Sequence, residues 1–358
     1  MIIFAIESSC DETSAAVLDA GESGIKVLSN IVSSQIATHA LYGGVVPEIA
    51  SRAHCEAVST VCEEALRAAS IAAGDIEAVA VTFAPGLIGS LLVGVSCAKA
   101  LAYRLGVPLI PVQHIEGHVS AAYIENNSLK PRFTALVVSG GHTSIYDVPD
   151  YGTFNEIGSS RDDACGEAFD KVGRVLGLPY PGGAAMDSLA AEGFREYSKD
   201  EFIHFPSPAV NDDSFDFSFS GLKTAVINTI HNYTQKIGTD VLPDSYRRLV
   251  AASFTKAVCD GITKKLRPAL TSQGSKTLVM AGGVAANSHL RNAVGEMCRH
   301  MKIDFVVPSM RLCGDNAAMI GARGYHSYLC GFVGGYDLDA YASDEMAEEY
   351  LSRIKNKI

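Results

Sequence analysis

Residues 107–118, Val-Pro-Leu-Ile-Pro-Val-Gln-His-Ile-Glu-Gly-His, join a short apolar run to two histidines four positions apart. The apolar run predicts a buried strand, and the residues after it predict a helix. In open α/β sheets, binding sites lie where strands end and helices begin. We therefore expect an α/β protein with a functional site at His114 and His118.

His114 and His118 have the spacing of two ligands of one metal ion. In a helix, positions i and i+4 lie on one face about 5–6 Å apart at Cβ, so both rings can bind the same divalent ion. The alternative is a surface turn with two unrelated histidines. Glu116 does not complete a zinc-protease motif, because in HExxH the glutamate directly follows the first histidine. It lies on a different face of the helix from the two rings.

A third ligand must come from elsewhere in the chain, and Asp315 is the candidate. It lies at the start of an apolar helix in Cys-Gly-Asp-Asn, residues 313–316. Two imidazoles and one carboxylate form a common metal site with open positions for substrate. An aspartate at this position is equally well explained by helix capping, so spacing alone leaves both interpretations open.

Composition indicates a folded protein of two domains or lobes, since 47% of the 358 residues are hydrophobic and 19% are charged. The N-terminal apolar run is short, lacks basic residues and meets Glu7 at once, which is unlike a signal peptide. No uncharged apolar stretch of 18 or more residues predicts a spanning helix. Nine cysteines without a CxxC pair argue against a disulfide framework and a thiolate zinc site. We expect a cytoplasmic protein without membrane contact.

The formal charge of −11 argues against indiscriminate nucleic-acid binding, which depends on neutralising phosphates. A nucleic-acid substrate would require a local basic patch or a helper protein. Candidate patches are residues 264–267 and the group Arg291, Arg299, His300 and Lys302. Solvated helix faces explain both patches equally well.

Strands and helices alternate along the chain. A strand, a polar turn and a second strand near residues 133–148 repeat the pattern of residues 2–18, which suggests an internal duplication. The predicted strands lie at residues 2–6, 14–18, 25–32, 76–83, 107–112, 133–138 and 145–148. The predicted helices lie at 47–65, 91–103, 164–176, 186–192, 222–233 and 246–266, and a last strand, helix, strand and helix run from 277 to 328.

Two glycine-rich turns have the composition of phosphate-binding loops. Residues 139–143, Ser-Gly-Gly-His-Thr, separate two strands, and residues 282–287, Gly-Gly-Val-Ala-Ala-Asn, separate a strand from a helix. Backbone N–H groups in such turns can face a phosphate. Neither turn is a Walker A loop, since GxxxxGK[ST] is absent, and each alone is compatible with an ordinary turn. Together with Tyr180–Gly183 they favour a nucleotide site between two lobes.

Eight motifs in one order resemble those of the bacterial TsaD-type tRNA N6-adenosine threonylcarbamoyltransferases. The resemblance covers about residues 1–330, with Glu7-Ser8-Ser9 where Glu-Thr-Ser is usual. The motifs occupy residues 6–13, 42–48, 114–118, 138–143, 166–171, 217–223, 282–287 and 313–316.

The resemblance implies an actin-like ATPase (ASKHA) fold, with two duplicated lobes and a nucleotide and metal cleft between them. The first lobe would comprise residues 1–130. The second would comprise residues 131–330, with a helical insertion at about 164–270. Residues 331–358, rich in Asp and Glu, would form a charged C-terminal tail.

The resemblance also implies an activity. Members of this family transfer the threonylcarbamoyl group of L-threonylcarbamoyladenylate to N6 of adenosine 37 in tRNAs that read ANN codons, giving t6A and AMP. A TsaB-like paralogue and a TsaE-like ATPase would be partners, and a TsaC-type synthase would supply the intermediate.

The family motifs imply a role for particular residues of this chain. His114, His118 and Asp315 would bind one divalent metal ion, Fe2+ or Zn2+. Asp11 and Glu12 would lie near the reacting centre, with Asp11 as a possible general base. The residues implied to hold the ATP or AMP moiety of the adenylate are Val137, Val138, Ser139, Gly140, Gly141, Asp170, Gly183, Asp187 and Asn287.

Three other functions are alternatives. A non-catalytic ATP-binding scaffold of the same fold would lack the set His114, His118 and Asp315, which is present here. A metalloprotease would need a base beside the metal, and Glu116 is poorly aimed for that role. A small-molecule kinase of the same fold is a more distant alternative.

Overall fold

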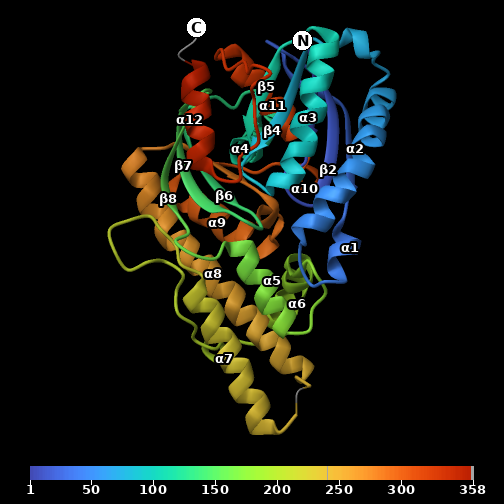
Figure 1. Cartoon of the computed structure of the whole chain (residues 1–358). Coiled ribbons are helices and arrows are strands. Elements are labelled where there is room, and N and C mark those ends of the chain that lie inside the picture. Colours follow the sequence, from blue (N-terminus) through green and yellow to red (C-terminus); the bar gives the residue numbers. More distant parts are fainter. Residues whose placement is uncertain (240, 356–358) are drawn as a thin grey trace. The chain divides into compact units, whose positions relative to one another are not determined.

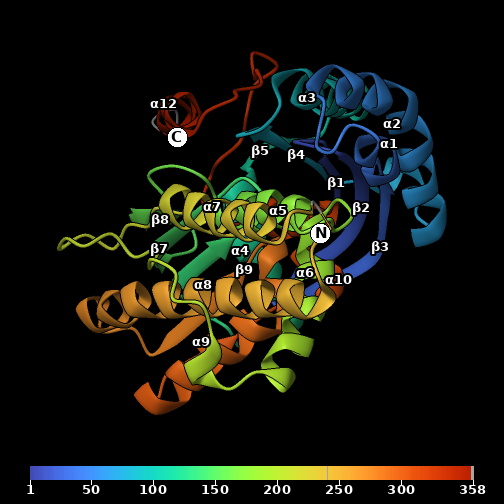
Figure 2. The ribbon, with the colours of Figure 1, turned by 90° about the horizontal axis from the view of Figure 1, so that it is seen from below.

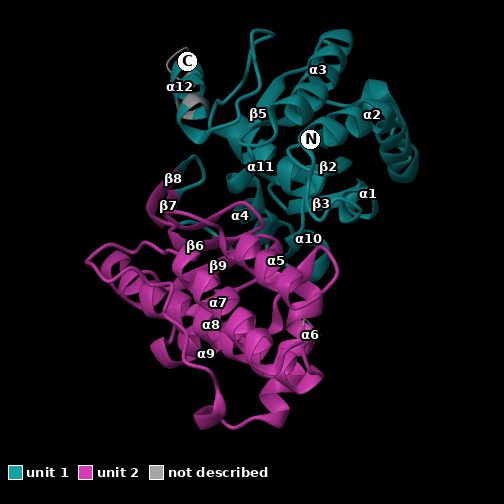
Figure 3. Ribbon diagram, turned by 60° about the horizontal axis from the view of Figure 1, so that its bottom comes forward, with its two compact units in different colours: residues 1–131, 150–153, 308–358 teal, residues 132–149, 154–307 magenta. Residues whose placement is uncertain are grey.

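The protein is described by a computed structural model that covers residues 1–239 and 241–355 (Figure 1). It contains two compact units, each with its own five-stranded sheet. Unit 1 comprises residues 1–131, 150–153 and 308–358, and unit 2 comprises residues 132–149 and 154–307 (Figure 3). Each unit is therefore built from segments that are distant in sequence.

The sheet of unit 1 has the strand order β3-β2-β1-β4-β5. The β1–β2 and β2–β3 pairs are antiparallel, whereas β1–β4 and β4–β5 are parallel. β1 and β4 are continuous buried runs, as expected for central strands covered on both faces. The strands are β1 (Ile2–Glu7), β2 (Glu12–Gly21), β3 (Gly24–Ser34), β4 (Ala78–Ala84) and β5 (Leu109–Gln113).

Helices cover both faces of this sheet. Val79 and Val81 of β4 belong to the apolar cluster formed with α2 and α3, whereas Gly324 of α11 lies directly over Ala80. Because successive strand side chains point to opposite faces, α2 and α3 lie on one face and α11 on the other. α4 packs beside α11. The helices are α1 (Ile36–Ala40), α2 (Pro47–Ala69), α3 (Ile88–Leu105), α4 (His114–Glu125), α10 (Met310–Cys313), α11 (Ala317–Leu329) and α12 (Asp344–Lys355).

The sheet of unit 2 has the order β10-β9-β6-β7-β8. Its longest helix, α8, packs against α6 and α9 (Figure 2). The strands are β6 (Phe133–Val138), β7 (Thr143–Asp150), β8 (Thr153–Ser159), β9 (Thr277–Ala281) and β10 (Asp304–Val306). The helices are α5 (Cys165–Val175), α6 (Gly182–Glu196), α7 (Ser220–Ile237), α8 (Asp244–Gln273) and α9 (Ser288–Met301).

The two sheets share one topology. In unit 1, β1 pairs antiparallel with β2 and parallel with β4. In unit 2, β6 pairs antiparallel with β7 and parallel with β9. The duplication suggested by the repeated strand, turn and strand pattern is therefore present in the topology. A strand or helix lies at every predicted position, and α1, β8, α10 and α12 are additional.

The compact units divide the chain differently from the predicted lobes. Residues 308–330 were expected in the second lobe, but they belong to unit 1. The physical reason is α11, whose buried residues pack on β1, β2 and α4. A Cβ at Gly321 would lie 2.2 Å from a Leu18 methyl carbon, so the helix approaches the sheet very closely.

The described part of the C-terminal segment, residues 331–355, does not form a solvated charged tail. α12 buries Ala347, Tyr350 and Ile354 in the apolar cluster that also contains Phe83. The Tyr350 ring centroid lies 5.7 Å from that of Phe83. The acidic residues of this segment predicted a charged tail, but apolar residues at positions i, i+3 and i+7 give it one buried helical face.

Among the described residues, α3 is long and apolar enough to cross a membrane by length and composition alone. Its face containing Leu91, Val95, Ala98 and Ala102 is buried, and the helix packs against α2 and β4. This packing is typical of a core helix.

Candidate functional site

His114 and His118 lie on α4, which begins directly after β5. The Gln113 side chain caps this helix, since its Oε1 accepts a hydrogen bond from the Glu116 amide at 2.8 Å. Both imidazoles are buried, and their ring centroids are 4.6 Å apart. The predicted change from strand to helix therefore places both histidines on one helix face.

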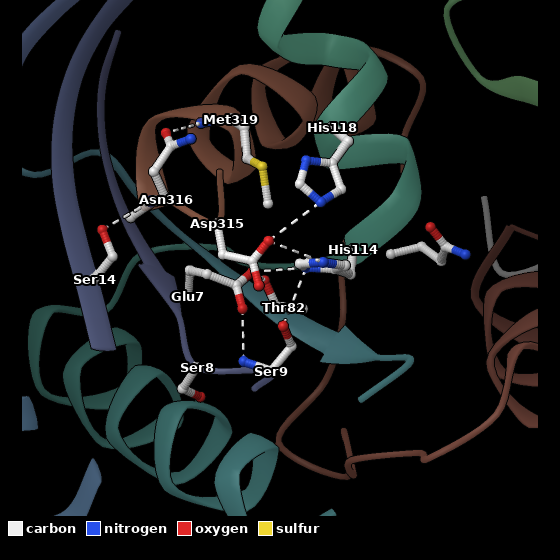
Figure 4. A network of polar contacts seen from close by, with 12 residues as sticks. Glu7, Ser8, Ser9, Ser14, Thr82, His114, His118, Asp315, Asn316 and Met319 are labelled. Carbon is white, nitrogen blue, oxygen red and sulfur yellow. Dashed lines mark hydrogen bonds and ion pairs between the residues drawn. The ribbon is translucent and has the colours of Figure 1, made fainter. Parts of the chain in front are cut away.

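Asp315 lies in unit 1 beside these rings (Figure 4). Its Oδ1 is 3.2 Å from His118 Nε2 and 3.5 Å from His114 Nε2. The N-cap of α11 is Asn316, whose side chain accepts a hydrogen bond from the Met319 amide at 3.1 Å. Capping therefore does not explain Asp315, and its carboxylate points toward the histidines instead.

His114, His118 and Asp315 fit the donor set of a metal centre. One potential ligand atom from each residue lies within 4.8 Å of the others. Both ring nitrogens of His118 are buried without a hydrogen-bond partner among the described residues, although Nε2 faces the Asp315 carboxylate. Buried imidazole nitrogens are normally satisfied, and a cation between these three residues would satisfy Nε2. Two imidazoles and a carboxylate suit a transition metal or zinc.

Glu7 orients His114 from the side opposite Asp315. It is fully buried, and its Oε2 lies 3.1 Å from His114 Nδ1. The same oxygen accepts a hydrogen bond from the Thr82 hydroxyl at 2.5 Å, and Oε1 accepts one from the Ser9 amide at 2.6 Å. A carboxylate on Nδ1 fixes the tautomer that leaves Nε2 available as a ligand. This role of Glu7 cannot be read from the sequence, because only the fold brings the end of β1 next to α4.

The electrostatics of this cluster favour charge on the imidazole. Burial lowers the pKa of His114, but the carboxylates of Asp315 and Glu7 outweigh it and raise that pKa to about 9. Burial opposes ionisation of Glu7, but the neighbouring His114 more than offsets it, so the net effect is a lowered pKa. The site therefore has excess negative charge that a cation would compensate.

Glu116 points away from the three candidate ligands. Its Oε2 accepts a hydrogen bond from the buried Arg323 at 2.6 Å, and Arg323 also donates to the Tyr151 carbonyl. The expectation that Glu116 is badly aimed toward the site is thus confirmed. It is held in a buried ion pair between α4 and α11.

Asp11 lies in the turn between β1 and β2, and Glu12 is the first residue of β2. The buried His54 of α2 holds this turn through the Thr13 hydroxyl at 2.7 Å and the Cys10 carbonyl at 2.9 Å. Burial together with the charges of Asp315 and Asp11 raises the pKa of Glu12 to about 9. The acidic turn therefore lies within electrostatic range of Asp315.

The two predicted glycine turns lie together in unit 2. Gly282 has φ +93°, and a Cβ there would lie 2.3 Å from the Val138 carbonyl oxygen, so only glycine fits. The first turn of α5 approaches the other glycine turn, since the Gly166 amide donates to the Ser139 carbonyl at 3.2 Å. Val137 and Val138 are buried at the end of β6, and Gly140 and Gly141 are followed by β7.

The remaining residues proposed for the adenylate lie beside these turns. Asp170 accepts a hydrogen bond from the Gly182 amide at 2.7 Å, which ties α5 to the start of α6 beside Gly183. Asp187 accepts one from the Ser288 amide at 3.1 Å, next to Asn287. Asn287 itself caps α9. All the adenylate candidates therefore belong to unit 2, and the three metal-ligand candidates belong to unit 1.

The predicted basic patch at residues 264–267 is not continuous. Lys264 and Arg267 are exposed, but Lys265 is buried and donates to the carbonyls of Asp212 and Ser214. Helical periodicity explains the difference, because adjacent residues face different directions.

The duplicated sheets and the buried His-His-Asp cluster define a protein of the actin-like ATPase fold with a candidate metal centre. Solved structures support this fold. HypF from T. kodakarensis has a TM-score of 0.59 at 13% identity, and it covers 94% of this chain and 48% of its own. A dehydratase activator from Clostridium difficile has a TM-score of 0.50 at 14% identity, covering 92% and 94%. These likenesses concern the fold alone.

Sequence comparison gives the family. The family model for TsaD, tRNA N6-adenosine threonylcarbamoyltransferase, matches residues 26–322. Proteins of that name from Geotalea uraniireducens and Clostridioides difficile are 50% and 48% identical to this chain over 340 residues. The matches cover 95% of this chain and 95% and 97% of the two relatives. The chain belongs to the family of tRNA N6-adenosine threonylcarbamoyltransferases, as the eight motifs predicted.

Proposed function

We propose that the chain transfers the threonylcarbamoyl group of L-threonylcarbamoyladenylate to N6 of adenosine 37 in tRNAs that read ANN codons, giving t6A and AMP. The observation that carries the proposal is the buried set His114, His118 and Asp315 in a chain that matches its relatives over nearly their whole length. In the reaction, N6 bonds to the carbamoyl carbonyl carbon and loses a proton, while the bond from that carbon to the phosphate oxygen breaks. AMP leaves with the electron pair.

His114, His118 and Asp315 would hold one divalent ion, either Fe2+ or Zn2+. When bound, such an ion supplies Lewis-acid polarisation of a substrate oxygen. Glu7 would keep the proton of His114 on Nδ1 and so present Nε2 to the ion. The buried position of both imidazoles limits competition by water.

The residues of unit 2 would bind the adenylate. Backbone N–H groups of the glycine turns offer donors to a phosphate without side chains in the way, because Gly140, Gly141 and Gly283 have nothing near their Cβ positions. Asp170, Gly183, Asp187 and Asn287 would place the nucleoside portion. Orientation of the leaving AMP would supply a large part of the acceleration.

Asp11 and Glu12 are proposed to act near the amine. Asp11, buried in the turn that precedes β2, is proposed as the base that accepts the N6 proton. Glu12 lies beside it, with its pKa raised by burial and by the neighbouring carboxylates of Asp315 and Asp11.

The proposal extends to partners and location. A TsaB-like paralogue, a TsaE-like ATPase and a TsaC-type synthase would assist this chain or supply its substrate in the cytoplasm. The net charge of −11 supports dependence on a helper for tRNA binding.

The test combines the purified chain, the proposed partner proteins, Zn2+ or Fe2+, threonylcarbamoyladenylate and unmodified ANN-reading tRNA. The tRNA is then digested, and threonylcarbamoyladenosine is measured by mass. We expect product from the wild type and from His231→Ala, an exposed histidine on α7. His114→Ala and Asp315→Ala should lose at least roughly 100-fold in rate, since each removes a metal ligand. Full activity in either variant would contradict the proposed site.

A metalloprotease is disfavoured by a specific contact. Glu116 is paired with Arg323 at 2.6 Å and faces away from the candidate ligands. The scaffold alternative predicts product from none of the variants, including the wild type. The same assay therefore separates it from the transferase.

A further inference from the structure

The C-terminal segment, residues 331–355, is hydrogen-bonded to β4 and to the edge strand β5 of unit 1. The Gly334 amide donates to the Leu109 carbonyl at 2.8 Å, and the Tyr341 amide donates to the Phe83 carbonyl at 2.8 Å. Lys99 of α3 donates to the Leu338 carbonyl at 2.8 Å. These contacts fix the path of the segment from β5 to β4 and lead it to the start of α12.

α12 is held at this position by its buried face. Tyr350 and Tyr341 both contact the ring of Phe83, with centroid distances of 5.7 and 6.0 Å. Ile354 and Ala347 are buried in the same cluster. This packing places the first turn of α12 close to β4 and β5.

Asp344, the first residue of α12, reaches the residue that caps the histidine helix. Its Oδ1 accepts a hydrogen bond from Gln113 Nε2 at 2.7 Å. The other end of the same amide, Oε1, accepts from the Glu116 N–H at 2.8 Å. Both contacts require this amide orientation, because a carboxylate only accepts and a backbone N–H only donates. A continuous relay thus connects α12 to the first turn of α4, which carries His114.

We propose that Asp344 is a positioning residue for the metal centre, acting through Gln113 on the first turn of α4. The inference rests on the proposed metal site. If Gln113 turned away, the Glu116 amide would lose its side-chain acceptor and the first turn of α4 would loosen. His114 would keep its side-chain contacts with Glu7 and Ser9, but the helix turn that carries it would be less firmly held. The C-terminal helix is in this way part of the apparatus that sets the ligand geometry.

The first measurement is hydrogen exchange in the full chain without metal, which tests the relay independently of transferase activity. Asp344→Ala should raise exchange in residues 113–118 by roughly three- to tenfold, as expected for loss of a cap contact. Asp344→Asn should remain near the wild type, because the asparagine oxygen still accepts from Gln113. Asp337→Ala is the matched control, since Asp337 lies in the same segment and pairs with the exposed Arg353.

The second measurement is Co2+ affinity and the visible spectrum of the Co2+-loaded protein, which reports ligand geometry. Asp344→Ala should weaken Co2+ binding by roughly three- to tenfold. This effect is smaller than the one expected when a carboxylate that is hydrogen-bonded directly to a metal ligand is removed. In a Gln113→Ala background, Asp344→Ala should add much less than it does in the wild type, because both changes break one relay. Unchanged α4 exchange in Asp344→Ala, or equal effects of Asp344→Ala and Asp337→Ala, would overturn the proposal. A wild type that binds no Co2+ would refute the metal site, while the exchange experiment would still decide the relay.

Discussion

Replacing Glu7 by glutamine is the sharpest perturbation of the candidate metal centre, because it keeps the shape of a buried side chain and removes its charge. The Glu7 carboxylate faces hydrogen-bond donors only. Ser9 N–H and the Thr82 hydroxyl donate to it, and His114 Nδ1 lies 3.1 Å from Oε2. A glutamine must direct its NH2 group toward one of these donors.

The orientation that costs least changes the tautomer of His114. The Ser9 amide can only donate, so the glutamine oxygen stays there and the NH2 group faces Thr82 and His114. The Thr82 hydroxyl can rotate to accept, and Nδ1 can accept only if the ring proton moves to Nε2. Nε2 is the nitrogen that faces Asp315. We expect metal affinity to fall roughly 10- to 100-fold, or about 1.4 to 2.7 kcal/mol.

The assay is competition for Zn2+ and Co2+ against a chromophoric chelator, with thermal unfolding of the metal-free protein measured in parallel. Glu56→Gln, an exposed change on α2, is the control and should bind as the wild type does. Thr82→Val should bind more tightly than Glu7→Gln, since it removes one neutral donor and leaves the carboxylate. If Glu7→Gln binds either metal within twofold of the wild type, the argument from the tautomer is refuted.

Two further predictions concern the backbone and the pH dependence of stability. Gly282→Ala should lower the unfolding free energy by at least about 1–3 kcal/mol, because residue 282 has a positive φ and a Cβ there would meet Val138. Gly283→Ala should be nearly neutral, since a Cβ at residue 283 meets nothing. Chemical denaturation of the two variants compares these effects. Burial and then Arg323 lower the pKa of His326 to about 4. The unfolded state therefore binds more protons than the folded state between pH 6.5 and 4. The free energy of unfolding should fall by up to about 3 kcal/mol as pH drops through that range. His326→Phe should flatten that part of the pH profile, and an unchanged slope would contradict the assignment.

Much of the fold could be predicted because its signals are local. The central strands are continuous apolar runs, and the glycine-rich turn at residues 282–287 is recognisable from its composition. The assignment of residues 308–330 to unit 1 could not be predicted locally. It depends on the close packing of α11 against β1 and β2, which only the three-dimensional structure reveals.

The candidate site likewise combines residues that the sequence indicates with residues that only the fold brings to the site. His114 and His118 are recognisable from spacing, since helical geometry alone puts them on one face. Asp315 could not be separated from a helix cap until the structure identified Asn316 as the cap of α11. Glu7 gave no signal, because its role depends on a parallel register that brings β1 beside the strands leading to α4.

Three segments of unit 1 meet at the imidazole of His114, and a fourth segment holds the start of the helix that carries it. β1 supplies Glu7, the start of α4 supplies the ring, the turn before α11 supplies Asp315, and α12 holds the cap through Asp344. No single segment can form the site, so the ligands become organised only when the first and last segments of the chain are packed in the same unit. Metal binding should therefore stabilise unit 1 by the linkage between ligand binding and folding. Loosening β1 or α12 should therefore reduce metal affinity, even though both histidines lie on α4.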